Sequence, residues 1–281
     1  MAKLYEKAKE VRKTIMDQVL SEGTAPTVAE ISRKHSLTAE EIDSIFKDLQ
    51  AAVCIAVQDE FHAGQTTFQD EPVEQGMPPV GEIFYARPFS NFKNHYKISV
   101  NGEQKWYGEC AVECCGVSAM FPGKEVVVQS VCRQTKEPVE LVGRDGDVLD
   151  VSPKTLRVHF GFPLGRIVDD MLGWCDFNSF FSSEDAVQEW RKTHPQIKGA
   201  TRDPETVSHI VAIVGKGRLD YDYQLEIPLG TMLRKMKWLG MTRPLPLLGV
   251  HVPDPFFMFT PHIFTEWKRK GYNNFIRFSL R

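Results

Sequence analysis

This chain of 281 residues lacks two kinds of segment, and each absence excludes one class of protein. No apolar run approaches the roughly 18 residues that a membrane-spanning helix requires. Residues 1–7 carry charges with no apolar stretch behind them, which is not the pattern of a secretory signal. We therefore expect a cytoplasmic protein with no membrane partner, in which cysteines stay reduced.

The chain also lacks an excess of charge of either sign. It has 34 Lys and Arg against 37 Asp and Glu, a net charge of −3. Such a balance provides no general attraction to nucleic acid or anionic lipid. The hydrophobic content of 42% and the charged content of 25% are ordinary for a globular protein, and the length allows one large domain or two smaller ones.

The cysteines lack the spacings of the common thiol sites. No Cys-x-x-Cys pair is present, which disfavours disulfide redox chemistry. Cys110 and Cys114 are suitably spaced for a metal, but no second pair follows, as structural zinc would require. A cysteine hydrolase needs a histidine base, and nothing in the sequence links His159 or His209 to a thiol.

The N-terminal part predicts three helices over residues 4–50. Capping boxes, Thr27 with Glu30 and Thr38 with Glu41, mark the starts of the second and third. Two short capped helices joined by a tight turn are typical of helix-turn-helix and winged-helix units.

The third of these helices has the wrong charge for reading DNA. Residues 39–49 contain four acids against one lysine, whereas a recognition helix must approach phosphates. We therefore predict a winged-helix-like helical domain over residues 1–62 that serves packing or dimerisation, with no nucleic-acid partner.

The rest of the chain predicts an α+β fold with a mixed, mainly antiparallel sheet. Residues 63–82, rich in Gly, Pro, Gln and acids, predict a linker. Asn101-Gly102 fits the two-residue turn of a hairpin. Further strands are expected near residues 125–128, 138–142, 148–149 and 156–160, and helices near 183–190 and 204–212. We assign residues 83–215 to a core and residues 216–281 to a C-terminal extension of unknown role.

The most informative feature is a cluster of thiols around one acid, with Cys110, Cys114 and Cys115 flanking Glu113. If a helix begins at Cys110, then Cys110, Glu113 and Cys114 share one face. The free amides at a helix N-terminus stabilise a thiolate and can lower a cysteine pKa from about 8.5 to roughly 3.5–7.5. Thiolates bind soft metals, and a carboxyl group can carry a proton.

With its neighbours, this cluster resembles the organomercurial (alkylmercury) lyases over roughly residues 80–212. Two segments are similar to motifs of the family: Cys110-Ala111-Val112-Glu113 to its Cys-Ala-Leu-Asp motif, and Cys132 to Val139 to its Cys-x-x-Thr-Gly-x-Pro-Val segment. The resemblance also includes Pro88-Phe89-Ser90 and the hairpin with Trp106-Tyr107. It ends with Trp174-Cys175, Phe180-Phe181 and the helix that follows.

The resemblance implies protonolysis of a carbon–mercury bond by two cysteines and an acid, without an organic cofactor. Carried over by position, Cys110 and Cys175 are the two catalytic cysteines and hold the product Hg(II). Glu113 is the acid, one methylene longer than the Asp of the family. The further, structural cysteine of the family falls on Cys132.

Several alternatives stay open. Cys114 and Cys115 lie outside the family pattern and either pack in the core or add ligands for a soft metal. Trp106, Phe180 and Phe181 either line an apolar pocket or pack in the core.

The resemblance implies an organomercurial substrate and exchange with cytosolic thiols, and it leaves open a hand-off of Hg(II) to a mercuric reductase. Rival functions are non-enzymatic sequestration of Hg or Cu, metal-sensing regulation, and lyase chemistry on another substrate. The sequence does not indicate the oligomeric state.

Overall fold

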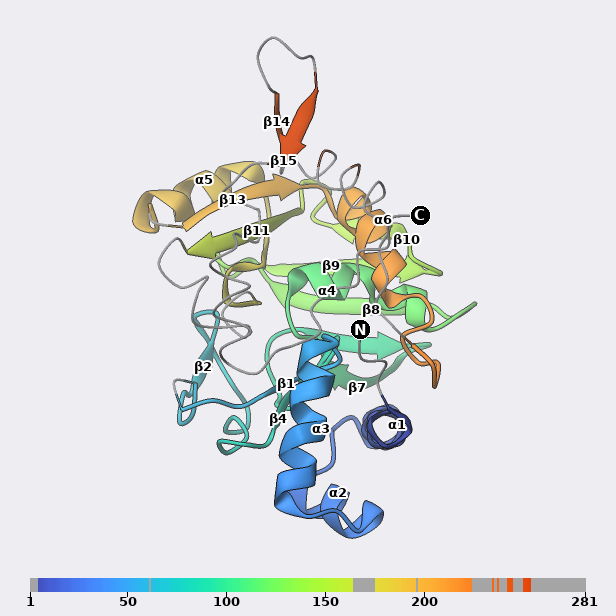
Figure 1. Cartoon of the computed structure of the whole chain (residues 1–281). Coiled ribbons are helices and arrows are strands. Elements are labelled where there is room, and N and C mark those ends of the chain that lie inside the picture. The colour runs from blue at the N-terminus through green and yellow to red at the C-terminus, as the bar shows by residue number, and fades with distance from the viewer. Residues whose placement is uncertain are drawn as a thin grey trace.

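The computed structural model describes residues 5–60, 62–163, 175–195 and 197–223, together with residues 234, 237, 242–244 and 250–253. The fold is α+β, as the sequence predicts. The N-terminal helices lie at one end of the molecule, and the sheets follow beyond them (Figure 1). Trp174 and most of the predicted extension over 216–281 lie outside the described residues.

The N-terminal part forms the three expected helices: α1 (Glu6–Glu22), α2 (Val28–His35) and α3 (Ala39–Ala51). Both predicted capping boxes are confirmed, since each Thr side chain accepts a hydrogen bond from the backbone of its Glu and each Glu side chain returns one. The apolar faces meet in the core through residues such as Ile15, Ile31 and Leu49. That this unit is winged-helix-like stays a prediction.

The segment expected to be a linker contributes to the packed structure. Within residues 63–82, β2 (Thr67–Phe68) and β3 (Glu71–Pro72) pair as a small hairpin. Phe68 and Gln69 are 3% and 7% exposed, so these two residues of the hairpin are buried. Gly, Pro and Gln suit a tight turn of this kind as well as a linker.

A three-stranded antiparallel sheet lies next to the N-terminal helices. It contains β1 (Ile55–Val57), β4 (Ile83–Ala86) and β5 (Phe89–Ser90), in the order β1-β4-β5. An isolated bridge between Phe89 and Gly108 joins its edge to the end of β7.

The largest sheet has five strands, all antiparallel to their neighbours, in the order β10-β9-β8-β6-β7. They are β6 (Lys97–Val100), β7 (Glu103–Tyr107), β8 (Val126–Val131), β9 (Pro138–Arg144) and β10 (Asp147–Ser152). The predicted Asn101-Gly102 turn is confirmed, with φ of 49° and 84°. Both residues take the left-handed region that a tight hairpin turn demands.

A second three-stranded sheet, in the order β12-β11-β13, is formed later in the chain. Its strands are β11 (Arg157–Pro163), β12 (Ser179–Phe181) and β13 (Ile197–Arg202), with helices α5 (Glu184–Thr193) and α6 (Pro204–Gly215), and a separate pair is formed by β14 (Thr242–Pro244) and β15 (His251–Pro253). The 3-10 turn η2 (Cys175–Phe177) leads directly into β12.

The short helix α4 (Ala111–Gly116) contacts α6, β11 and β12 and continues into the 3-10 turn η1 (Val117–Met120) (Figure 1). Gly116 allows the contact with α6, because a Cβ there would lie 2.5 Å from Val211 Cγ1. The central helix of the fold therefore carries the cysteine cluster. None of the helices in the described ranges is both long and apolar enough to cross a bilayer.

Candidate thiol site

Cys110 stands at the start of α4, as the sequence predicts. Its backbone is extended, and its carbonyl accepts the N–H of Cys114 at 2.9 Å, the first bond of the helix. The next amide, that of Ala111, donates to the Asn178 carbonyl at 3.1 Å. The helix start is thereby tied to the loop that carries the second cysteine.

The structure brings Cys175 to Cys110. Cys175 begins η2, is 3% exposed, and lies close enough to Cys110 for that thiol to raise the pKa of Cys175. The Asn178 carboxamide lies 4.0 Å from Cys110 Sγ. All six cysteines of the chain are free and buried. Two reduced sulfurs, distant in sequence, thus lie side by side in a water-poor interior.

Gln69, in the turn of the β2–β3 hairpin, holds the Cys175 loop in place. The Gln69 amide group donates to the carbonyl of Cys175 and, at 3.4 Å, to that of Asn178. Its Oε1 accepts from the Tyr96 hydroxyl at 2.5 Å and from Ser179 Oγ at 2.9 Å. Sequence reasoning missed Gln69 because it lies in the predicted linker and nothing local shows what its amide will contact.

Arg133 braces the same loop from the end of β8. Its Nη1 donates to the Asp176 carbonyl and, at 3.1 Å, to Ser179 Oγ. Its Nε donates to Asp70 in the β2–β3 turn at 3.0 Å. One guanidinium therefore joins the hairpin turn to the segment that follows Cys175.

The carboxyl group in contact with the thiols belongs to Glu109. Cys175 Sγ donates to Glu109 Oε1 at 2.9 Å, and Arg87 Nη1 approaches the same oxygen at 2.7 Å. The Glu109 backbone N–H donates to the Pro88 carbonyl at 2.9 Å, which fixes it at the corner between β4 and β5. Glu109 is fully buried, and its Oε2 has no hydrogen-bond partner in the part of the chain that the structure describes.

Burial raises the pKa of Glu109, and the charge of Arg87 offsets only part of that rise. The pKa of Cys175 is raised well above its ordinary value, first by burial and then by the adjacent Cys110 and Glu109. At neutral pH Cys175 therefore keeps its proton, which it shares with a carboxyl group that accepts protons more readily than an exposed glutamate.

Glu113, the acid expected from the sequence, has a different partner. Its Oε2 accepts from Arg218 Nη1 at 2.8 Å. Burial alone would raise the pKa of Glu113, but the guanidinium groups of Arg218 and Arg87 outweigh it and hold the pKa below its usual value. Glu113 is therefore an ionised member of an ion pair, whereas Glu109 contacts the thiol.

Arg218 is itself positioned by the first helix. Arg12, on α1, donates through Nη2 to the Arg218 carbonyl and through Nη1 to the Asp220 carbonyl at 2.8 Å. The Arg12 guanidinium also lies over the Tyr223 ring, 4.9 Å from its centroid. The N-terminal helix thus fixes the turn that supplies the partner of Glu113.

The neighbouring thiols Cys114 and Cys115 pack in the core. A Cβ on Gly108 would lie 2.2 Å from Cys114 Sγ, so this sulfur sits directly against the chain leaving β7. Burial raises the pKa of both thiols well above the ordinary value. Across the described ranges, no three Cys, His, Asp or Glu side chains are grouped so that they could hold a metal ion.

The histidine and aromatic candidates serve the fold. His159 Nδ1 hydrogen-bonds with the Phe177 carbonyl at 3.0 Å, and burial lowers the His159 pKa to about 4. Trp106 donates its indole N–H to the Val19 carbonyl at 2.8 Å, and Phe180 packs against Tyr96. His209 lines a different hollow, beside α6.

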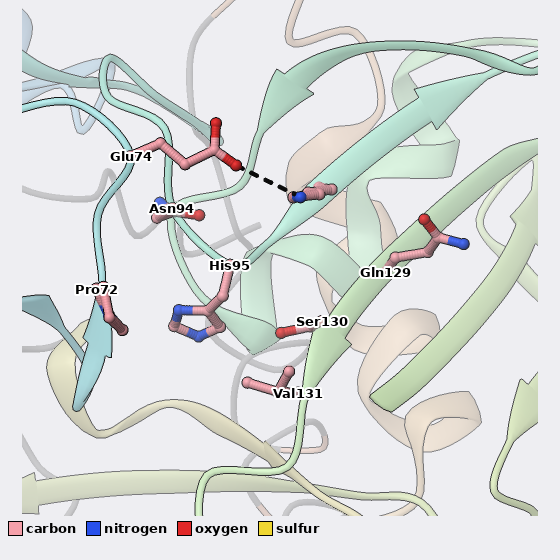
Figure 2. A pocket seen from close by; sticks show the side chains of 8 residues that line it. Pro72, Glu74, Asn94, His95, Gln129, Ser130 and Val131 are labelled. Carbon is pink, nitrogen blue, oxygen red and sulfur yellow. Dashed lines mark ion pairs between the residues drawn. The ribbon is translucent and has the colours of Figure 1, made fainter. Parts of the chain in front are cut away.

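A separate cavity of about 280 Å³ lies beside β6 and β8, and Figure 2 shows the side chains that line it. Glu74 and Lys97 form an ion pair across it at 3.5 Å. His95 Nδ1 and Ser130 Oγ have no hydrogen-bond partner among the described residues. Its lining contains no thiol, so this cavity is distinct from the site formed by Cys110 and Cys175.

Comparison with known proteins shows which family the chain resembles. Residues 89–214 match the family model described as alkylmercury lyase. This region is therefore similar to the alkylmercury lyases. The alkylmercury lyases of Bacillus cereus and Clostridium butyricum are each 31% identical over 104 residues, which is 36% of this chain and 44% of theirs. The chain thus spans less than half the length of these curated relatives.

A solved structure shares the fold. The mercury-bound form of MerB2 superposes with a TM-score of 0.53 at 18% identity, covering 76% of this chain and 92% of that one. The region that matches the family model contains Cys110, Cys175, Glu109 and Glu113. Gln69, Arg12, Arg87 and Arg218, which brace or neutralise the site, lie outside the matched range.

Proposed function

We propose that this protein cleaves carbon–mercury bonds by protonolysis, releasing a hydrocarbon and keeping Hg(II) between Cys110 and Cys175. The proximity of the two thiols, one of which hydrogen-bonds to a buried carboxyl group, carries this proposal. Similarity to the alkylmercury lyase family supports it. The substrate class is an organomercurial bound to a small thiol.

The reaction needs only the side chains of the site. The Cys110 sulfur displaces the carrier thiol from mercury, and the proton of Cys110 leaves with that thiol. Cys175 then gives up its proton to a carboxyl group and binds mercury as a second thiolate. The added electron density weakens the carbon–mercury bond, and the same proton is transferred to the carbon.

Sulfur suits this role better than imidazole because mercury is a soft metal and thiolates are soft ligands. Removal of the product requires competing thiols, so small cytosolic thiols, with or without a mercuric reductase, are the proposed acceptors of Hg(II).

The test is incubation with phenylmercury and measurement of benzene by gas chromatography. The parent protein is expected to release benzene. Cys110→Ala should neither capture phenylmercury nor release benzene. Cys175→Ala should still capture phenylmercury, seen as an added mass on the intact protein, but should release no benzene. Cys54→Ala, which removes a buried thiol that donates to the Ala52 carbonyl, is the matched control and should keep the parent rate.

Lyase activity and non-enzymatic sequestration give different results in this test. Capture of phenylmercury without benzene by the parent protein would contradict the lyase proposal and favour sequestration of soft metals. Benzene release by Cys175→Ala at the parent rate would contradict the two-thiol mechanism.

A further inference from the structure

We propose that Glu109 is the catalytic residue that takes the proton of Cys175 and delivers it to the departing carbon. This inference rests on the proposed function and names a residue that differs from the acid indicated by the motif. The motif places the acid at Glu113, three residues after Cys110, whereas Glu109 immediately precedes Cys110.

The first argument is contact. Glu109 Oε1 accepts the hydrogen bond of Cys175 Sγ at 2.9 Å, so the proton already lies on the line between the two groups. The hydrogen bond of Glu113 goes to Arg218 at 2.8 Å. Proton transfer from Cys175 to Glu109 needs no movement of either side chain, while transfer to Glu113 would require breaking a buried ion pair.

The second argument is capacity. Cys175 and Arg87 both approach Oε1 of Glu109, and Oε2 is buried without a hydrogen-bond partner among the residues described. Oε1 can therefore receive the thiol proton and donate it onward, while the uncommitted Oε2 leaves the protonated carboxyl group free to turn toward the carbon.

The third argument is charge balance. Arg87 pairs with Glu109 and Arg218 pairs with Glu113, so two guanidinium groups face two carboxylates. When Glu109 is protonated, Arg87 is left with less compensation, which favours return of the carboxylate once the carbon has taken the proton. Glu113 stays ionised throughout and acts as the fixed partner of Arg218.

The step balances without an external oxidant or reductant. The Cys175 S–H bond breaks and its proton moves to Glu109, while the sulfur binds mercury as a thiolate. The electron pair of the carbon–mercury bond then takes the proton from Glu109, forming the C–H bond. The products are the hydrocarbon, Hg(II) bound by Cys110 and Cys175, and the regenerated Glu109 carboxylate.

The experiment compares Glu109→Gln with Glu113→Gln in a single turnover on phenylmercury, measuring benzene release and the mass of the captured phenylmercury adduct. Glu109→Gln should capture phenylmercury as the parent does but release benzene more slowly by about a hundredfold or more. The fall in the rate of benzene release should be at least about tenfold smaller in Glu113→Gln than in Glu109→Gln. Glu125→Gln changes an exposed glutamate in the same way and should keep the parent rate.

A further variant covers the risk that Glu109→Gln fails to fold with Arg87 buried and uncompensated. Glu109→Asp keeps the charge but shortens the reach to Cys175 Sγ, and it should slow benzene release by roughly tenfold or more with phenylmercury capture unchanged. Parent-rate turnover by Glu109→Asp, or loss of turnover in Glu113→Gln with Glu109→Gln active, would overturn the assignment to Glu109. No benzene from the parent protein would instead reject the proposed function itself.

Discussion

Cys132 is a buried thiol whose contacts are with structural side chains, outside the proposed reaction. Its sulfur accepts hydrogen bonds from the Thr135 N–H at 3.4 Å and the Ser182 hydroxyl at 3.5 Å. Burial would raise the Cys132 pKa, but these hydrogen bonds bring it below the ordinary value. The sulfur thus closes the turn between β8 and β9 against the start of α5.

Replacement of Cys132 should therefore affect stability more than activity. Cys132→Ala leaves two donors without an acceptor and is expected to lower the free energy of unfolding by about 1–3 kcal/mol, measured in urea. Cys132→Ser restores an acceptor and should lose less. Benzene release per folded molecule should equal that of the parent in both. Loss of benzene release at full stability would show that Cys132 takes part in the chemistry.

Single side chains also decide which of Glu109 and Glu113 contacts the Cys175 thiol. They lie four positions apart, and the helical spacing that links Glu113 to Cys110 is visible in the sequence. The direction of Glu109 depends on its backbone bond to Pro88 and on Arg87, which come from another hairpin. The assignment of the acid to Glu113 stays a prediction that the paired variants decide.

Among the elements, the β2–β3 hairpin has the largest effect for its size. Its Gln69 carboxamide makes four hydrogen bonds around the Cys175 loop. A loop fixed in this way presents its thiol in one position, which a two-thiol reaction requires.

Gln69→Leu should consequently impair the reaction at a distance from the reacting atoms. It removes the bonds to the carbonyls of Cys175 and Asn178, so benzene release should fall by up to about a hundredfold through misplacement of the Cys175 sulfur. Gln129→Leu is the matched control, because Gln129 is exposed and bonds to Glu140 across β8 and β9. Equal rates for the two variants would show that the hairpin does not position Cys175.

The elements that the sequence predicts well are those specified by neighbouring residues. The capping boxes at Thr27 and Thr38 and the turn at Asn101-Gly102 depend on local backbone geometry, and all three are confirmed. A helix following Cys110, which the sequence left as an assumption, is present as α4. The burial of Gln69 within residues 63–82 was not predicted, because it is decided by distant parts of the chain.

The residues of the site also differ in how far the sequence could predict them. The proximity of Cys110 and Cys175 was expected only from resemblance to a family, since no periodicity connects residues so far apart. Gln69, Arg87 and Arg218 could not have been found from the sequence, because each is defined by a tertiary contact with a loop or carboxyl group elsewhere in the chain.

Among the described residues, His95 and His159 have pKa values that burial lowers well below the usual range, which makes the stability sensitive to acid. Burial lowers the pKa of His95 to about 3 and that of His159 to about 4, from an ordinary value of 6.5. Positive charge on Arg133 lowers both further, and Asp70 opposes this at His95. The unfolded chain therefore binds protons below pH 6.5 that the folded protein does not.

Stability should be full above about pH 6.5 and should fall as the pH drops toward about 4, by roughly 1.4 kcal/mol per pH unit for each histidine. Urea unfolding between pH 7.5 and 4.5 measures this slope. His159→Gln is expected to make it shallower while leaving the contribution of His95. An unchanged slope in that variant would mean that His159 is already protonated in the folded protein.

The bond from Arg12 to the Arg218 carbonyl also bears on how the chain is made. Arg218 comes 105 residues after Glu113, its carboxylate partner, and 206 residues after Arg12. Because translation proceeds from the N-terminus, the ribosome releases both sulfurs before the guanidinium that neutralises the adjacent acid. The nascent polypeptide cannot complete its reactive centre until residue 218 has left the exit tunnel and docked on the first helix.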